Sequence, residues 1–239
     1  MTMQLFYSTD IQGEVITLHN EEHQHCVRAL RHKQGDTVYI TDGMGGLYHA
    51  AILSIEKNKT ICAIHEKEIH AREGSQVSVA VAPTKNHARI EWFVEKAVEL
   101  GISEICFFRS DHSERKQLNT DRTARIAISA MKQSNQVFLP DIQYFDSFDT
   151  LLEHGRQAQC RLIAHCQEDL PFITSAQEDA KSTIILIGPE GDFSMAEIQK
   201  SKDTGFQGIS LGNTRLRTET AALTALILLK FNPHHTALP

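Results

Sequence analysis

The sequence is poor in features that cross-link a chain or anchor it in a membrane. Its 239 residues include five cysteines, an odd number, and no two of them have C-x-x-C spacing. We therefore expect reduced thiols rather than disulfides, and no metal site. No apolar run is long enough to span a bilayer. The first residues lack a basic segment followed by an apolar one, so we expect no signal peptide and a cytoplasmic protein.

The chain also lacks the basic excess of a general nucleic-acid coat protein. Its formal net charge is −6, with 24 Lys and Arg against 30 Asp and Glu. The charge is uneven, because residues 83–133 carry nine basic against seven acidic residues, and residues 141–239 carry eight against thirteen. Any contact with RNA phosphates should therefore be local and lie in the first two-thirds of the chain.

Two common phosphate-binding motifs, G-x-G-x-x-G and G-x-x-x-x-G-K-[ST], are absent. Their absence counts against a generic nucleotide-binding α/β enzyme, which is one of the functions that we considered.

The first 70 residues predict a small β-barrel with one helix. Alternating or β-branched runs predict strands at 14–18, 36–41, 47–55 and 60–65, with a hairpin turn at Asp42–Gly46. Asn20 is expected to cap a helix whose first turn carries two acids. A polar stretch at 72–76 predicts a domain boundary, giving domains 1–73 and 74–239.

Histidines and basic residues gather around this helix. A metal site at His23 and His25 is disfavoured, because positions two apart on a helix point to different faces. Arg28, Arg31 and Lys33 lie at the helix end, where either the helix dipole or a bound phosphate would favour cations.

From Val77 onward the pattern alternates between strands and helices, which predicts a parallel sheet covered by helices. Strands are expected at 77–82, 104–108, 142–145, 161–166, 184–187 and 209–211, and helices at 86–100, 120–134, 148–157, from Ser194, and 221–229. The last helix is apolar on nearly every face, which is typical of a helix buried on all sides or at a subunit interface.

Two glycine turns follow the last two predicted strands. Gly188-Pro189-Glu190-Gly191 precedes Ser194-Met195-Ala196-Glu197, which has capping-box spacing. The stretch 211–221 places two arginines, one carboxylate and three hydroxyls around a second helix start. Ligands of open α/β sheets bind beyond the carboxyl ends of the strands, where such turns gather.

These two motifs, IGPEG-x-FS-x-x-EI and LG-x-x-x-LRTETA, resemble the signature of the small-subunit (16S) ribosomal RNA uracil-N3 methyltransferases of the SPOUT superfamily. The resemblance extends to HxxxVRALRHKQGD and PTKNHARIEWFVEKAVELGI, and so covers nearly the whole chain. The chain departs from the usual pattern at Asp192, where the family usually has a second glycine. This residue adds a side chain and a charge beside the expected cofactor loop.

The resemblance implies a PUA-like RNA-binding barrel at 1–73 and, at 74–239, a SPOUT domain with a C-terminal trefoil knot that binds S-adenosylmethionine. It also implies a homodimer that acts on ribosomal RNA in the small subunit. The cofactor residues would be Ala164, His165, Ile187, Gly188, Glu190, Gly191, Leu211, Gly212, Leu216, Arg217, Thr218 and Thr220.

For catalysis we expect Arg217, and Glu219 as a possible base, with Glu190 as the other nearby carboxylate. The expected RNA contacts are Arg28, Arg31, Lys33, Lys85, Arg109 and Arg115. The alternative function is a non-catalytic RNA-binding or ribosome-assembly factor that retains the fold; Asp192 is the feature that leaves room for it.

Overall fold

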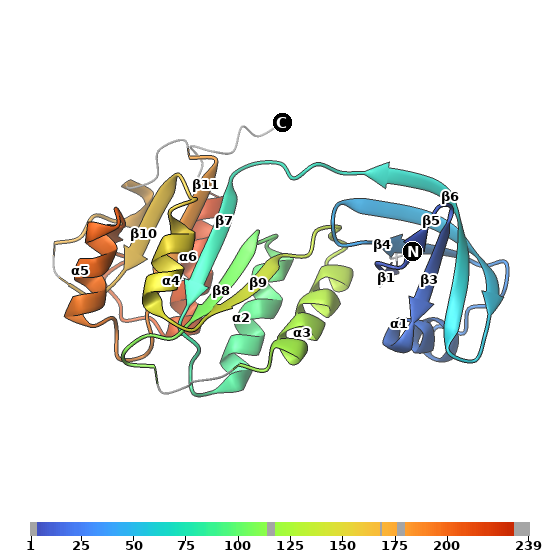
Figure 1. The fold of residues 1–239 in the computed structure, drawn as a ribbon, viewed down its shortest axis with the longest axis horizontal. Coiled ribbons are helices and arrows are strands. Elements are labelled where there is room, and N and C mark those ends of the chain that lie inside the picture. The colour runs from blue at the N-terminus through green and yellow to red at the C-terminus, as the bar shows by residue number, and fades with distance from the viewer. Residues whose placement is uncertain (1–3, 114–117, 168, 176–179, 232–239) are drawn as a thin grey trace. The chain divides into compact units, whose positions relative to one another are not determined.

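The computed structural model describes residues 4–113, 118–167, 169–175 and 180–231. The chain forms two compact units, one of residues 1–73 and 128–139 and the other of residues 74–127 and 140–239 (Figure 1). Among the described residues, no helix is long and apolar enough to cross a membrane.

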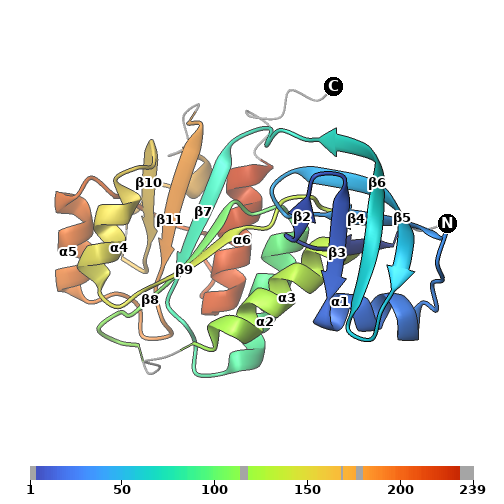
Figure 2. The same cartoon turned by 45° about the vertical axis from the view of Figure 1, so that its right-hand side comes forward.

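The first unit is a six-stranded, mostly antiparallel sheet in the order β1-β4-β5-β6-β3-β2. Figure 2 labels its strands from β2 to β6. Its strands are β1 (Leu5–Tyr7), β2 (Ile11–Gln12), β3 (Val15–His19), β4 (Thr37–Thr41), β5 (Gly46–Ile55) and β6 (Lys59–Ile69). The two edge strands, β1 and β2, are separated by only the residues from Ser8 to Asp10. Since so short a segment cannot span a flat sheet of this width, the sheet must curl until its edges approach.

A short helix closes one end of this sheet. It consists of α1 (Asn20–Gln24) and a π-helical turn, η1 (His25–Ala29). The expected Asn20 cap is wrong, because Asn20 has a left-handed φ of 45° and the N-cap position is His19, whose side chain makes no capping bond. His23 is buried, with Nδ1 2.8 Å from Thr60 Oγ1, which accounts for it as a core residue.

The predicted hairpin turn joins β4 to β5 and is organised by Asp42. Its carboxylate accepts hydrogen bonds from the backbone of Met44 and Gly46 and from the Tyr48 hydroxyl at 2.7–2.9 Å. The segment after α3 (Thr120–Gln133) lies against this turn: Gly45 N donates to Val137 O, and Leu139 N donates to Gly43 O. This contact explains why residues 128–139 group with the first unit.

The second unit contains a parallel six-stranded sheet in the order β12-β10-β11-β7-β8-β9. Its strands are β7 (Gln76–Val81), β8 (Glu104–Phe108), β9 (Asp141–Phe145), β10 (Cys160–Ala164), β11 (Ser182–Ile187) and β12 (Gln207–Ile209). The chain adds β8 and β9 on one side of β7 and the last three strands on the other. Such a reversal of strand order is where ligand sites of open sheets form.

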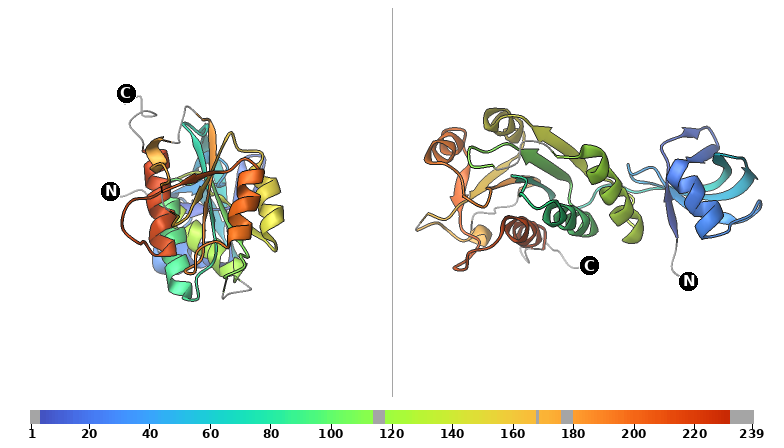
Figure 3. Two further views of the ribbon diagram at one scale, coloured as in Figure 1. Left: turned by 90° about the vertical axis from the view of Figure 1, so that its left-hand side faces the viewer. Right: turned by 90° about the horizontal axis from the view of Figure 1, so that it is seen from below.

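Helices cover both faces of this sheet (Figure 3). They are α2 (His87–Glu99), α4 (Phe148–Gly155), α5 (Met195–Asp203) and α6 (Thr218–Lys230), with a 3-10 turn η2 at Ile173–Ser175. Buried residues of α4 and α5 pack with Ala80, Cys106 and Leu186 on one face, while α2 and α6 lie together on the other. The predicted parallel sheet between two helical layers is therefore confirmed.

The apolar helix α6 is not buried on all sides within one chain, so the first of its two expected settings is wrong, while a subunit interface stays a prediction. Ala222, Ala225, Leu226 and Leu229 are buried, where α6 packs on α2, β7 and β11. In contrast, 41% of Ile227 is exposed. Among the residues that the structure describes, the helix therefore has an apolar side that is left partly uncovered at Ile227.

Candidate active site

Three loops meet at the carboxyl edge of the parallel sheet. They follow β10, β11 and β12, whose ends are level because Ala164 is in register with both Ile187 and Ile209. The loops enclose a cavity of about 870 Å³, to which α2 adds Arg89 and α6 adds Ala221. The predicted ligand turns thus lie together around one hollow.

The loop after β11 is held by a turn and by the helix that follows it. Asp192 N donates to Pro189 O at 3.0 Å, which closes the turn. Ser194 and Glu197 form the predicted capping box at the start of α5. The buried Glu197 carboxylate also accepts hydrogen bonds from Ser110 Oγ and Asp111 N at 3.1 and 3.0 Å, so α5 anchors the loop after β8 as well.

The loop after β12 is tied to its neighbour through backbone carbonyls. Thr218 Oγ1 donates to Gly188 O at 3.2 Å, and an Arg215 guanidinium nitrogen donates to Glu190 O at 3.3 Å. These bonds fix the start of α6 against the glycine turn, leaving Arg217 as the exposed N-cap residue.

Charges of both signs line the cavity. Arg89, Arg215 and Arg217 supply cations, and Glu190 and Asp192 supply carboxylates. His165 is buried on the wall, and burial lowers its pKa although Asp192 opposes that effect. Such a wall suits a ligand that itself carries both positive and negative groups.

Of the expected cofactor residues, all but Gly191 and Thr220 line the cavity. The interpretation of the sequence missed other lining residues, which are Arg89, Cys166, Gln167, Pro189, Asp192, Ser210, Asn213, Thr214, Arg215 and Ala221. Most of them lie within or next to the two glycine turns, so these turns could have indicated them from the sequence. Arg89 comes from a distant helix, and no local pattern indicates it.

The two expected catalytic residues have different surroundings. Arg217 lines the cavity, whereas Glu219 does not. Glu219 is 7% exposed, and its Oε1 lies 3.5 Å from Arg89 Nε, while its Oε2 is buried without a hydrogen-bond partner among the described residues. Glu219 therefore faces Arg89 rather than the cavity.

The expected RNA-binding residues fall in both units. In the first unit, Arg28, Arg31 and Lys33 are exposed at the end of the π-helical turn. In the second, Lys85 and Arg109 are exposed just after β7 and β8, at the same edge of the sheet as the cavity. Arg115 lies outside the described residues.

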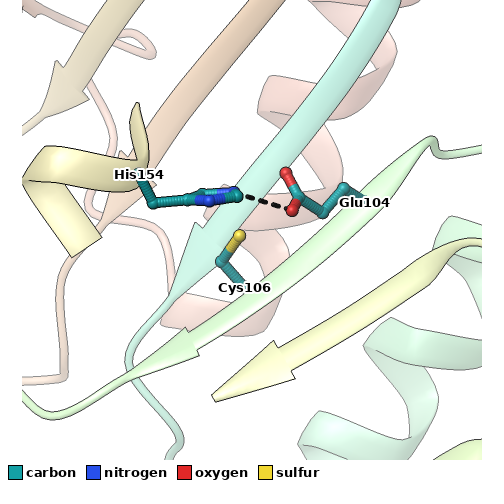
Figure 4. Close-up of side chains that lie close together, drawn as sticks. All are labelled: Glu104, Cys106 and His154. Carbon is teal, nitrogen blue, oxygen red and sulfur yellow. Dashed lines mark hydrogen bonds and ion pairs between the residues drawn. The ribbon is translucent and has the colours of Figure 1, made fainter. Parts of the chain in front are cut away.

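A second cluster of chemically active side chains lies at the opposite edge of the sheet. Glu104, Cys106 and His154 place one potential metal-ligand atom each within 4.8 Å of one another (Figure 4). The Glu104 carboxylate is already hydrogen bonded to His154 at 2.8 Å and Gln143 at 3.0 Å. Burial raises the pKa of the Cys106 thiol, which keeps it protonated. These contacts brace β8, β9 and α4 and account for the cluster.

Comparison with known proteins gives a consistent result. Residues 71–230 match the family model of the RNA methyltransferase domain, and residues 18–64 match that of the RNA methyltransferase PUA domain. A probable rRNA-methyltransferase from Porphyromonas gingivalis is 38% identical, with a TM-score of 0.87 over 94% of this chain and 95% of that one.

Two further relatives extend the match. A Legionella pneumophila protein described as a methyltransferase, solved with the cofactor SAM, is 26% identical with a TM-score of 0.82, over 96% of this chain and 97% of that one. Ribosomal RNA small subunit methyltransferase E of Buchnera aphidicola is 29% identical, covering 89% of this chain and 86% of the relative. The present chain, with its N-terminal PUA domain and α/β methyltransferase domain, therefore belongs to the RNA methyltransferase family that includes ribosomal RNA small subunit methyltransferase E.

Proposed function

We propose that this protein transfers a methyl group from S-adenosylmethionine to N3 of a uridine in small-subunit (16S) ribosomal RNA. The observation that carries the proposal is the cavity formed by three loops at the carboxyl edge of the parallel sheet. It is supported by family membership and by the relative whose structure holds SAM.

The residues around the cavity fit this donor. A cavity of about 870 Å³ lies within the usual range of about 300–1,000 Å³ for small-molecule sites. Backbone groups of Ile187, Gly188, Leu211 and Leu216 would hold the adenosine part. The cations and carboxylates on the wall match the donor's amino-acid part, which carries both charges. Gly191 and Thr220 lie outside the lining and are assigned supporting roles beside it.

We also propose that these loops form a trefoil knot. Residues after β10 run beside the last loop, since Ile173 N donates to Ser210 O at 3.1 Å and Ser210 N donates to Pro171 O at 2.8 Å. The chain then reaches α6, which packs against β7, β11 and η2. The segment that leads to α6 therefore passes beside the loop after β10, as a trefoil knot requires of a C-terminal segment that threads through an earlier loop.

When bound, S-adenosylmethionine supplies an electrophilic methyl group on a positively charged sulfur that leaves readily. The protein must hold N3 in line with that methyl group and exclude water. Since N3 carries a proton and lies on the Watson–Crick edge, the base must be unpaired and its anion stabilised. Arg217, exposed at the N-terminus of α6, would stabilise that negative charge.

For the proton itself, the geometry favours Glu190 over Glu219. Glu190 is exposed and lines the cavity, whereas Glu219 contacts Arg89 and acts best by orienting that arginine. We therefore keep Arg217 in a catalytic role and assign Glu219 to positioning.

RNA would be held by the basic residues of both units. Lys85 and Arg109 lie at the edge of the sheet where the base must enter, and Arg28, Arg31 and Lys33 present cations on the PUA domain. Because the chain is acidic overall, these local groups would dominate phosphate binding.

A homodimer is part of the same proposal. The exposed apolar face of α6, with Ile227 at its centre, would be covered by a second copy.

Methyl incorporation from labelled S-adenosylmethionine tests the proposal, with unmodified small subunits and fully modified subunits as paired substrates. We expect label only in the unmodified subunits. A protein that binds small subunits yet transfers no methyl group would instead be the non-catalytic assembly factor.

A further inference from the structure

Asp192 has a backbone conformation that ordinarily favours glycine. Its φ is 63°, in the left-handed region that aspartate adopts only occasionally. It lies within the turn after β11 and is one of the residues that line the cavity. A charged residue with a left-handed φ is expected to make interactions that offset the strain of this backbone conformation.

The Asp192 carboxylate joins two of the three loops. Oδ1 accepts a hydrogen bond from Phe193 N at 2.8 Å within its own loop. Oδ2 accepts one from Cys166 N at 2.9 Å, in the loop that follows β10. The backbone carbonyl of Asp192 also lies 3.0 Å from His112 Nδ1. The side chain therefore acts as a clamp between the loops that begin at Ala164 and Ile187.

The same carboxylate contributes negative charge to the cavity wall. The arginines of the cavity come from α2 and from the loop after β12, while Asp192 and Glu190 both lie on the loop after β11. Asp192 is only partly exposed, so its field is less screened by water than that of the more exposed Glu190.

We propose that Asp192 is a specificity-determining residue that makes this site prefer the cationic sulfonium donor to its neutral thioether product, while clamping the loop at Cys166. The inference rests on the proposed function, because the ligand pair is the methyl donor and S-adenosylhomocysteine. The two ligands share every group except the transferred methyl and its positive charge. Their affinity ratio therefore isolates the effect of charge from any general loss of loop order.

The test is calorimetric titration of both ligands into wild-type protein and Asp192→Asn. Asparagine retains the size of the side chain and tolerates a left-handed φ. It removes the charge and, because its amide has a single acceptor oxygen, it can accept only one of the two backbone hydrogen bonds. We expect the affinity ratio of donor to product to fall by about three- to tenfold in the variant, as for the loss of one partly screened unit charge within a cavity. High salt should shrink the wild-type ratio toward that of the variant.

Asp203→Asn is the matched control, since Asp203 ends α5, is exposed and does not line the cavity. The ratio of its affinities for donor and product should equal that of wild-type protein. If wild-type protein binds both ligands and Asp192→Asn leaves the ratio unchanged, the inference fails and the proposed function stands. If wild-type protein binds neither ligand, both fail.

The clamp has its own readout, which needs no ligand. Asp192→Gly removes both side-chain acceptors and leaves a residue that adopts the same φ freely. We expect faster amide hydrogen exchange at Cys166 in this variant, with exchange in the central strand β7 unchanged. Equal exchange at Cys166 in variant and wild type would overturn the clamp.

Discussion

Arg217 and Glu219 are two positions apart at the start of α6, yet they meet different surroundings. Arg217 occupies the N-cap and is exposed to the cavity, while Glu219 turns inward against Arg89. About half a turn of helix thus separates a group that can reach a substrate from one that can act only through its neighbour. At the scale of single residues, the direction in which each side chain points determines whether it can contact a substrate.

Replacing Arg217 by alanine should reduce methyl transfer by about 100- to 1,000-fold, the usual effect of removing one donor aimed at developing charge. The thermal unfolding midpoint should stay near that of wild type, because the side chain is exposed and makes no capping bond. Arg156→Ala, at an exposed arginine paired with Glu153 at the end of α4, is the matched control and should retain full turnover. Unchanged turnover in folded Arg217→Ala would remove Arg217 from the chemistry.

Cys166 offers a pH-dependent readout of the cavity wall. Burial raises the pKa of its thiol, and the Asp192 charge and hydrogen bond raise it further. A raised pKa means less thiolate at a given pH, so the alkylation rate of Cys166 should rise only at a pH above the ordinary thiol range. Asp192→Asn should move that rise to lower pH, as followed by peptide mass spectrometry.

Cys160 serves as the internal control, because its pKa is raised by burial and no Asp192 effect contributes. An identical pH profile for Cys166 in the variant and in wild type would contradict the predicted influence of Asp192.

At the scale of elements, the cavity depends on loops that are held from outside it. Glu197 is the main anchor: one buried carboxylate accepts hydrogen bonds from Ser194 N, Ser110 Oγ and Asp111 N. The capping box of α5 therefore also fixes the loop after β8. The loops at this edge of the sheet are held in place because the start of α5 and the loop after β8 bind the same carboxylate, that of Glu197.

Glu197→Ala should lower the free energy of unfolding by about 2–4 kcal/mol, because three donors lose their buried acceptor. Urea denaturation measures this directly. Glu153→Ala, at an exposed helical glutamate, should change stability by no more than about 0.5 kcal/mol. A loss for Glu197→Ala as small as that of the control would show that the anchor is dispensable.

The elements themselves were largely predictable from the sequence. Hydrophobic periodicity located the strands of the parallel sheet and its helices to within a few residues, and the Ser194 capping box and the Asp42–Gly46 turn are as predicted. Local chemistry determines such features. The Asn20 cap failed because Asn20 itself has a left-handed φ. Asparagine favours both capping and left-handed positions, so its residue type alone does not decide between them.

The site was predictable only in part, for a related reason. The two glycine turns identified most of the cavity, since their residues are contiguous in the chain. The contribution of Arg89 and the inward orientation of Glu219 depend on how α2 packs against α6, which is a tertiary contact without a local signal.

At the scale of the whole molecule, the exposed face of α6 bears on assembly. A helix with buried Ala222, Ala225, Leu226 and Leu229 on one side and exposed Ile227 on the other presents apolar surface that water solvates poorly. A second copy of the chain is the partner that the proposed function assigns to it.

Wild-type protein should therefore run as a dimer in size-exclusion chromatography with light scattering at micromolar concentration, and Ile227→Asp should run as a monomer. Ile69→Asp is the matched control, because Ile69 is also exposed but ends β6 in the first unit. It should remain dimeric. A wild-type monomer would contradict the assembly.

The identity of the methylated nucleoside tests the proposed reaction most directly. Unmodified small ribosomal subunits would be incubated with the protein and labelled S-adenosylmethionine, and the digested RNA analysed by mass spectrometry. We expect labelled 3-methyluridine and no other labelled nucleoside. A different methylated nucleoside, or a methyl group on ribose, would contradict the proposed reaction.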